Sequence, residues 1–220
     1  AGLFEKGNPA QSELAGKAEL IGHADHQAIA AQAVRESLVL LKNNAQLLPL
    51  APKQKVLVTG DGADNIGKQS GGWTLTWQGT GNVNADFPNG RSIYSGIQQQ
   101  VEAAQGTVEL SADGSYQQKP DVAIVVIGEN PYAEFDGDIR TLDYQAGKNT
   151  DLEVLKKLKA DGIPVVTVFL TGRPLWVNPE LNQSDAFVAA WLTGTAGQAV
   201  AEGLFKTATG EIQHDFKGKL

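Results

Sequence analysis

The chain has 220 residues, 41% of them hydrophobic, which is enough to bury the core of one large domain. Its formal net charge of -7 and sequence pI near 5.0 argue against nucleic acids and anionic membranes as partners. Cysteine is absent, which excludes disulfides, thiol catalysis and thiolate metal sites, and no run approaches the roughly 18 apolar residues of a membrane helix.

Residues 1–24 are expected to form a linker. Glycines and Pro9 are scattered there among polar residues, a composition typical of a connecting segment. The sequence contains no methionine, even at position 1, and we therefore expect it to be a piece of a longer protein. Residues 25–220 are expected to form one domain.

This domain begins with a predicted amphipathic helix over 26–42, in which apolar residues recur at spacings of three and four. Unbroken apolar runs follow, as is typical of strands that are covered on both faces. Helical patterns separate these runs, and the alternation predicts an α/β fold, an open and mostly parallel sheet with helices on both faces. The predicted strands are 55–59, 122–127, 164–170 and 186–192, and the further predicted helices are 92–105, 150–160 and 197–206.

Two connections, 60–91 and 128–148, are far longer than the usual loop of roughly 2–6 residues. Both follow predicted strands, and the carboxyl ends of parallel strands form the ligand-binding edge of such sheets. We therefore expect the functional residues to lie in these two loops.

The first of these loops starts with GDGADNIG, which begins like a dinucleotide-binding fingerprint. Asn65 stands where that fingerprint requires glycine, and residues 68–81 show no helical period. Asp61 and Asp64 would also repel a pyrophosphate. The pattern therefore favours a plain turn over a nucleotide site.

The same loop continues with GGWTLTWQG, residues 71–79, which places two tryptophans among glycines. For Trp77, burial in the core and exposure are equally compatible with the sequence. Trp73 follows two glycines, and a flexible backbone can present its flat ring to the CH face of a sugar. We expect a binding role for Trp73.

The second loop is acidic, with Glu129, Glu134, Asp136 and Asp138 within ten residues. Such a loop is most often a solvated surface. Glu129, however, lies two residues past the end of a strand expected to be buried, and we expect apolar walls around it that favour its protonated form. A carboxylic acid kept neutral is a general acid, and the neighbouring aspartates would add to the effect. The spacing does not match the calcium ligands of an EF-hand.

The remaining candidates are weaker. His23 and His26 hint at a metal pair, but a third nearby ligand is lacking, so surface histidines are the favoured interpretation. His214 stands alone. Arg173, after the third predicted strand, is either a ligand contact or a structural ion pair, with structure slightly favoured.

Several longer motifs follow one another along the chain: AGLFEKGNP, ESLVLLKNNAQLLPL, GGWTLTWQG, AIVVIGENPYAEFDGD, GRPLWV and AAWLTGTAGQAVAEGLF. By these motifs, taken in order, the chain resembles the second domain of glycoside hydrolase family 3, and in particular its exo-β-glucanase branch. The resemblance runs from end to end. It departs from the family pattern at Ala196, where glutamate is usual, and at Thr193, where proline is common.

The resemblance implies an active site built from two domains. A first, TIM-barrel-like domain, missing from this sequence, would supply the aspartate nucleophile and most contacts to the terminal glucose. The second domain would supply the acid/base carboxylate and one of two tryptophans that clamp the next sugar. Motif matching assigns the acid/base role to Glu129, with Glu134 as reserve candidate, and the clamp to Trp73. Gly72, Glu134 and Asp138 are further expected substrate contacts.

The implied reaction is retaining hydrolysis of β-glucosidic bonds by an exo-acting β-glucosidase or exo-1,3/1,4-β-glucanase, which removes glucose from the non-reducing end of a β-glucan or oligosaccharide. No cofactor or metal is expected, and the isolated domain should be inactive. The resemblance also implies export to the periplasm or the outside of the cell. The alternative is a stand-alone carbohydrate-binding or scaffold domain, in which Trp73 stacks on sugar and the carboxylates only make hydrogen bonds.

Overall fold

The computed structural model describes residues 2 and 4–220. Its centre is a six-stranded sheet with the strand order β1-β6-β5-β4-β2-β3. Only β1 runs antiparallel to its neighbour, and the other pairs are parallel. The strands are β1 (Val39–Asn43), β2 (Lys55–Thr59), β3 (Thr107–Ser111), β4 (Val122–Gly128), β5 (Val165–Leu170) and β6 (Ala186–Trp191).

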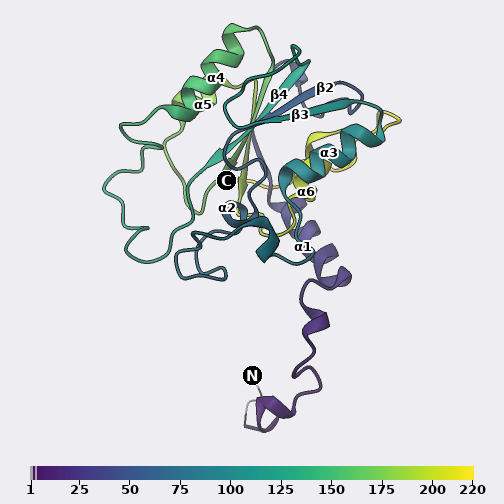
Figure 1. Cartoon of the computed structure of the whole chain (residues 1–220), viewed down its shortest axis with the longest axis vertical. Coiled ribbons are helices and arrows are strands. Elements are labelled where there is room, and N and C mark those ends of the chain that lie inside the picture. The colour runs from purple at the N-terminus through teal and green to yellow at the C-terminus, as the bar shows by residue number, and fades with distance from the viewer. Residues whose placement is uncertain (1, 3) are drawn as a thin grey trace.

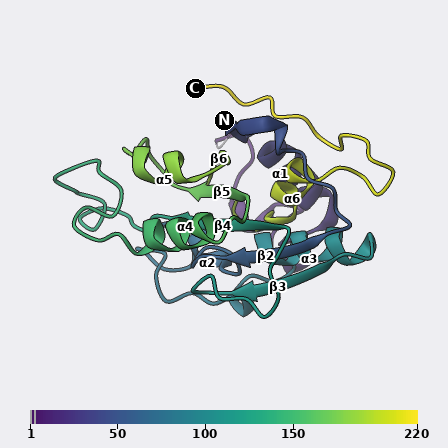
Figure 2. The same ribbon diagram turned by 90° about the horizontal axis from the view of Figure 1, so that it is seen from above.

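Helices cover both faces of this sheet, as Figure 2 shows. The first, third and sixth helices share one apolar cluster with one face of the sheet, and the fourth and fifth share a second cluster with the other face. Every residue of β4 and β5 is buried between the two layers, which explains their unbroken apolar sequences. The predicted α/β fold is confirmed. The helices are α1 (Ala24–Ser37), α2 (Ile66–Ser70), α3 (Ile93–Ala103), α4 (Thr150–Ala160), α5 (Asn178–Gln183) and α6 (Gln198–Leu204), with 3-10 turns at Pro9–Gln11, Ala18–Leu20, Asn44–Gln46 and Asn84–Asp86.

The first predicted helix was too long. Helix α1 ends at Ser37, and the apolar residues that follow form β1, in which Val39 pairs with Ala189 of β6. Valine and leucine at these positions fit a strand as well as a helix, so the pairing with β6 decides the outcome.

Three short elements were not predicted: α2, α5 and β3. Helix α2 includes Lys68–Ser70, a stretch in which no helix was expected, and it starts where the Asn65 side chain accepts a hydrogen bond from the amide of Lys68. Strand β3 lies at the edge of the sheet and is only partly buried, so its sequence lacks an unbroken apolar run.

The sheet brings the two long loops together. Strand β2 pairs with β4, with Val56 opposite Val122, so the segments that follow these strands leave the same edge side by side. Both loops therefore lie at the edge where such sheets bind ligands, and ligand binding there stays a prediction.

The N-terminal segment extends away from this body, as Figure 1 shows in purple. Residues 4–18 are exposed throughout. The linker expected over 1–24 stays a prediction, and residues 1 and 3 of that range lie outside the described residues. Within residues 2 and 4–220, none of the helices combines the length and the apolar character needed to cross a membrane.

Candidate functional site

A tight hairpin over residues 71–79 forms one side of the candidate site. The amide of Trp73 donates to the carbonyl of Trp77 at 2.8 Å, which closes the hairpin. Gly79 has φ +73°, and a Cβ atom there would collide with the carbonyl oxygen of Gly71, so the two ends of the hairpin touch backbone to backbone. The hairpin is therefore a rigid support for its side chains.

Three aromatic side chains form an exposed patch, which we call the aromatic platform: Trp73, Trp77 and Phe135. The three residues are 69%, 48% and 72% exposed, respectively. The ring centroids of the two tryptophans lie 6.1 Å apart, and those of Trp77 and Phe135 lie 5.8 Å apart at 81°. Burial of Trp77 in the core, one of the two possibilities for this residue, is thus not observed. The expected exposure of Trp73 is confirmed.

Glu134 lies against this platform. Its Oε2 accepts a hydrogen bond from the indole nitrogen of Trp77 at 2.7 Å, and the side chain is otherwise exposed. The hydrogen bond from Trp77, with smaller contributions from the backbone and from Trp73, lowers the pKa of the Glu134 carboxyl. In this domain taken alone, Glu134 is therefore a carboxylate at neutral pH.

Glu129 lies deeper, with a side chain only 13% exposed. Its surroundings are polar rather than apolar, which corrects the expectation from the sequence. Oε1 pairs with Nε of Arg173 at 3.0 Å, and Oε2 accepts from the Thr171 hydroxyl at 2.6 Å and from the Tyr132 hydroxyl at 3.4 Å. These three donors occupy both oxygens of the Glu129 carboxyl group.

Arg173 links Glu129 to the rest of the acidic loop. Its guanidinium lies 3.9 Å from the centroid of the Tyr132 ring and donates through Nη1 to the carbonyl of Gly137 at 2.7 Å. The structural ion pair slightly favoured for Arg173 is thus present, and its partners hold both ends of the segment 129–137.

Gly72 is expected as a substrate contact, and the structure places it where the hairpin meets the acidic loop. A Cβ atom at Gly72 would collide with the carbonyl oxygen of Tyr132, so only glycine allows this approach. Asp136 and Asp138 are exposed, and their amides close turns by donating to the carbonyls of Glu134 and Phe135.

A cleft of about 600 Å³ extends from Glu129 and Arg173 to Tyr144 and Lys148. It contains the ion pair of the buried Lys68 with Asp61, at 2.6 Å. Across the part of the chain that the structure describes, three or more metal-ligating side chains do not come together. His23 and His26 lie near each other, far along the chain from this cleft, and both are exposed.

Sequence reasoning did not single out Gln78. Its side chain makes two hydrogen bonds to the backbone of the acidic loop. Oε1 accepts from the amide of Ala133 at 2.6 Å, and Nε2 donates to the carbonyl of Glu134 at 2.8 Å. Its position directly after Trp77 was the only signal in the sequence.

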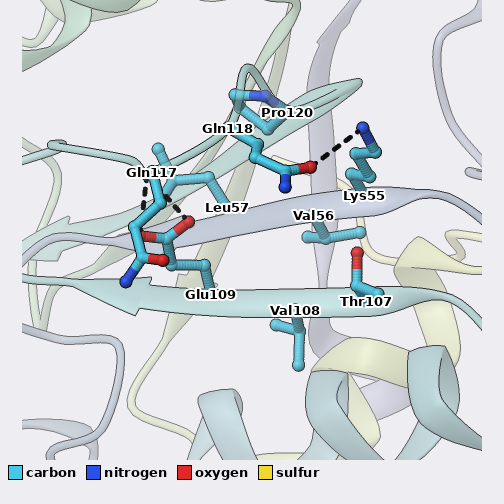
Figure 3. A pocket seen from close by; sticks show the side chains of 9 residues that line it. All are labelled: Lys55, Val56, Leu57, Thr107, Val108, Glu109, Gln117, Gln118 and Pro120. Carbon is cyan, nitrogen blue, oxygen red and sulfur yellow. Dashed lines mark hydrogen bonds between the residues drawn. The ribbon is translucent and has the colours of Figure 1, made fainter.

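A second hollow, of about 370 Å³, lies between β2, β3 and residues 117–120 (Figure 3). Its polar side chains bond within the wall: Lys55 donates to Gln118, and Glu109 accepts from the amide of Gln117. We assign it no function.

Comparison with known proteins identifies the family. Residues 38–220 match the sequence model of the family described as "Glycosyl hydrolase family 3 C-terminal domain". The chain belongs to glycoside hydrolase family 3. A lysosomal beta glucosidase of Dictyostelium discoideum is 34% identical over 89% of this chain and 26% of its own length, and a periplasmic beta-glucosidase of Salmonella typhimurium is 29% identical over 82% of this chain and 27% of its own length.

Solved structures of an exo-glucanase and a beta-glucosidase share the fold. The exo-1,3/1,4-beta-glucanase ExoP from a Pseudoalteromonas species is 55% identical, with a TM-score of 0.93 over 96% of this chain and 27% of that chain. A beta-glucosidase from Listeria innocua in complex with glucose is 26% identical, with a TM-score of 0.69 over 86% of this chain and 26% of that chain. The family 3 domain described here therefore spans about a quarter of the length of these relatives.

Proposed function

We propose that this family 3 domain supplies the acid/base carboxylate and an aromatic wall of the sugar site to a retaining, exo-acting β-glucosidase or exo-1,3/1,4-β-glucanase. The enzyme would remove glucose from the non-reducing end of β-glucans. The observation that carries the proposal is the carboxylate of Glu134, held at 2.7 Å by the indole of an exposed tryptophan where two loops meet. The activities named for the relatives are consistent with it.

We assign the acid/base role to Glu134, the reserve candidate, ahead of Glu129. A group that exchanges protons with substrate and water needs a free approach, and Glu134 is exposed beside the aromatic platform. Glu129 accepts hydrogen bonds from Arg173, Thr171 and Tyr132 and lies mostly buried. The contacts of Glu129 suit a structural anchor.

In the proposed reaction, an aspartate of the first domain attacks the anomeric carbon of the terminal glucose. The bond from that carbon to the leaving oxygen breaks, and Glu134 gives its proton to the leaving oxygen. Glu134 then takes a proton from water, the water oxygen bonds to the anomeric carbon, and the aspartate is released. Trp73 would stack on the sugar next to the cleaved bond.

The low pKa of Glu134 in this domain alone has a consequence for the complete site. A general acid must hold its proton near neutral pH, and a second carboxylate about 5–5.5 Å away raises the pKa of its neighbour. We propose that the nucleophile of the first domain provides this charge. The isolated domain would then be inactive for two reasons, since it lacks the nucleophile and its own acid is deprotonated.

The remaining proposals concern the whole protein. Residues 1–24 would link this domain to a preceding TIM-barrel-like domain. Export to the periplasm or the outside of the cell is consistent with the periplasmic and lysosomal relatives.

The test is Glu134→Gln in an enzyme that joins this domain to its first domain. We expect kcat/KM for laminaribiose to fall about 10²–10⁴-fold, because the poor leaving group departs only with a proton. For an aryl glucoside with an activated leaving group, kcat/KM should change little, whereas kcat should fall because water attack lacks its base. Added azide, an anion that needs no base, should restore turnover of the aryl glucoside.

Glu129→Gln is the matched control in the same loop. It should lower the stability of the domain and affect both substrates alike. If Glu129→Gln gives the leaving-group dependence and azide rescue instead, the role belongs to Glu129. If neither variant does, and sugar still binds to the platform, the domain is a carbohydrate-binding module rather than part of a catalytic site.

A further inference from the structure

Gln78 grips the backbone of the acidic loop at the residue proposed as the acid/base. Its amide makes two hydrogen bonds, at 2.6 Å to the Ala133 amide and at 2.8 Å to the Glu134 carbonyl. A primary amide has a donor and an acceptor side by side, so it can satisfy both backbone groups at once, as a neighbouring strand would. Two simultaneous bonds fix both the distance and the orientation of Glu134.

The base from which Gln78 reaches is itself immobilised. The Thr76 hydroxyl donates to the carbonyl of Thr80 at 3.0 Å, and Asn82 donates through Nδ2 to the carbonyls of Thr74 and Gly79. Movement of the Gln78 backbone would break these bonds. The side chain therefore transmits the position of the hairpin to the acidic loop.

The side chain of Glu134 is held by the same hairpin. Trp77, directly before Gln78, donates its indole N–H to Oε2 of Glu134 at 2.7 Å. Consecutive residues of one hairpin thus hold the backbone and the carboxylate of a single glutamate. At the far end of the segment, Arg173 holds the carbonyl of Gly137.

We propose that Gln78 is a positioning residue, which sets the place of the Glu134 carboxylate relative to the bond being cleaved. The inference rests on the function proposed above. An acid/base group acts only within hydrogen-bond reach of the atom it protonates, and a misplacement of about 1 Å can cost about 10²-fold in rate. Gln78 itself does not touch the reacting atoms.

The experiment replaces Gln78 by leucine, a side chain of similar size without hydrogen-bonding groups, in an enzyme with both domains. We expect kcat/KM for laminaribiose to fall about 10–100-fold, with kcat/KM for an activated aryl glucoside little changed. Hydrogen exchange at the Ala133 amide should become faster, because this amide loses its acceptor. Gln78→Glu keeps the acceptor for the Ala133 amide but puts a carboxylate oxygen against the Glu134 carbonyl. If the leucine variant does not fold, the same two substrates are compared with Gln78→Glu.

Gln98→Leu on α3 is the control, since Gln98 is also half-buried but bonds to Glu102, away from the site. It should leave both substrates unaffected. A purely structural role for Gln78 would reduce activity on both substrates equally, and that result, or no loss at all, would overturn the proposal. Glu134→Gln, measured in parallel, separates the role of Gln78 from the proposed function. If Glu134→Gln shows leaving-group dependence and Gln78→Leu does not, only the role of Gln78 is wrong. If Glu134→Gln shows no leaving-group dependence, both the proposed function and the role of Gln78 are wrong.

Discussion

Glu129 and Glu134 are five residues apart in one loop, yet their surroundings give them different properties. The carboxyl group of Glu129 accepts hydrogen bonds from a guanidinium and two hydroxyls. At Glu134 the indole N–H of Trp77 donates to the carboxylate and lowers its pKa, and the residue is otherwise exposed. A carboxyl group whose hydrogen-bonding positions are filled by protein groups is suited to a structural role. A carboxyl group that solvent and substrate can reach is able to exchange protons.

We expect Arg173→Met to destabilise the chain by roughly 3–5 kcal/mol, because it leaves the Glu129 carboxylate buried without its counter-ion. It also removes the donor to Gly137. Urea unfolding followed by tryptophan fluorescence measures the change. The double variant Glu129→Leu/Arg173→Met should be less destabilised than Arg173→Met alone, since no charge is then buried unpaired; an equal or greater loss in the double variant would contradict this account.

At the scale of elements, helices and strands with a strong sequence pattern were predicted correctly, and those with a weak or ambiguous pattern were not. Helix α4 has the predicted bounds because its leucines repeat at helical spacing and pack against one face of the sheet. Strand β1 was assigned to a helix because its apolar residues fit both periods. The edge strand β3 escaped prediction because only one of its faces contacts the protein core.

The packing of α4 gives a prediction at this scale. Leu155 is fully buried between α4 and the sheet, so Leu155→Ala should cost about 2–5 kcal/mol through lost contacts and the cavity left behind. Lys156→Ala, on the exposed side of the same helix, should stay within about 0.5 kcal/mol. Denaturant unfolding of both variants checks the difference, and similar values would show that α4 does not pack as described.

At the scale of the whole molecule, the fold brings the acidic side chains of Asp61, Asp151 and Glu180, which are far apart in the sequence, close enough to affect one another's pKa. Asp151, at the start of α4, accepts hydrogen bonds from Tyr144 at 2.5 Å and from Gln145 at 2.9 Å. Burial, with a smaller contribution from the charge of Asp61, nevertheless raises the pKa of Asp151, and burial also raises the pKa of Glu180.

These raised pKa values predict a pH dependence of stability. The folded chain holds the protons of Asp151 and Glu180 more tightly than the unfolded chain does, so their contribution is present below the unfolded values of about 3.9 and 4.3. It is lost as the pH rises through the folded values. Asp151→Asn cannot ionise, and its unfolding free energy should therefore fall less than that of the unchanged chain over this range. Parallel unfolding curves from pH 4 upward test this, and identical slopes for the two chains would contradict it.

The sequence alone determined the fold class, the two long loops and the exposure of Trp73, because these follow from local patterns: apolar period, loop length and neighbouring glycines. It could not decide between Glu129 and Glu134. The charge and accessibility of a carboxyl depend on partners that folding brings to it, and Arg173 and Trp77 lie 44 and 57 residues away along the chain. The proposals that Glu134 exchanges protons and that Gln78 supports it therefore rest on the tertiary structure.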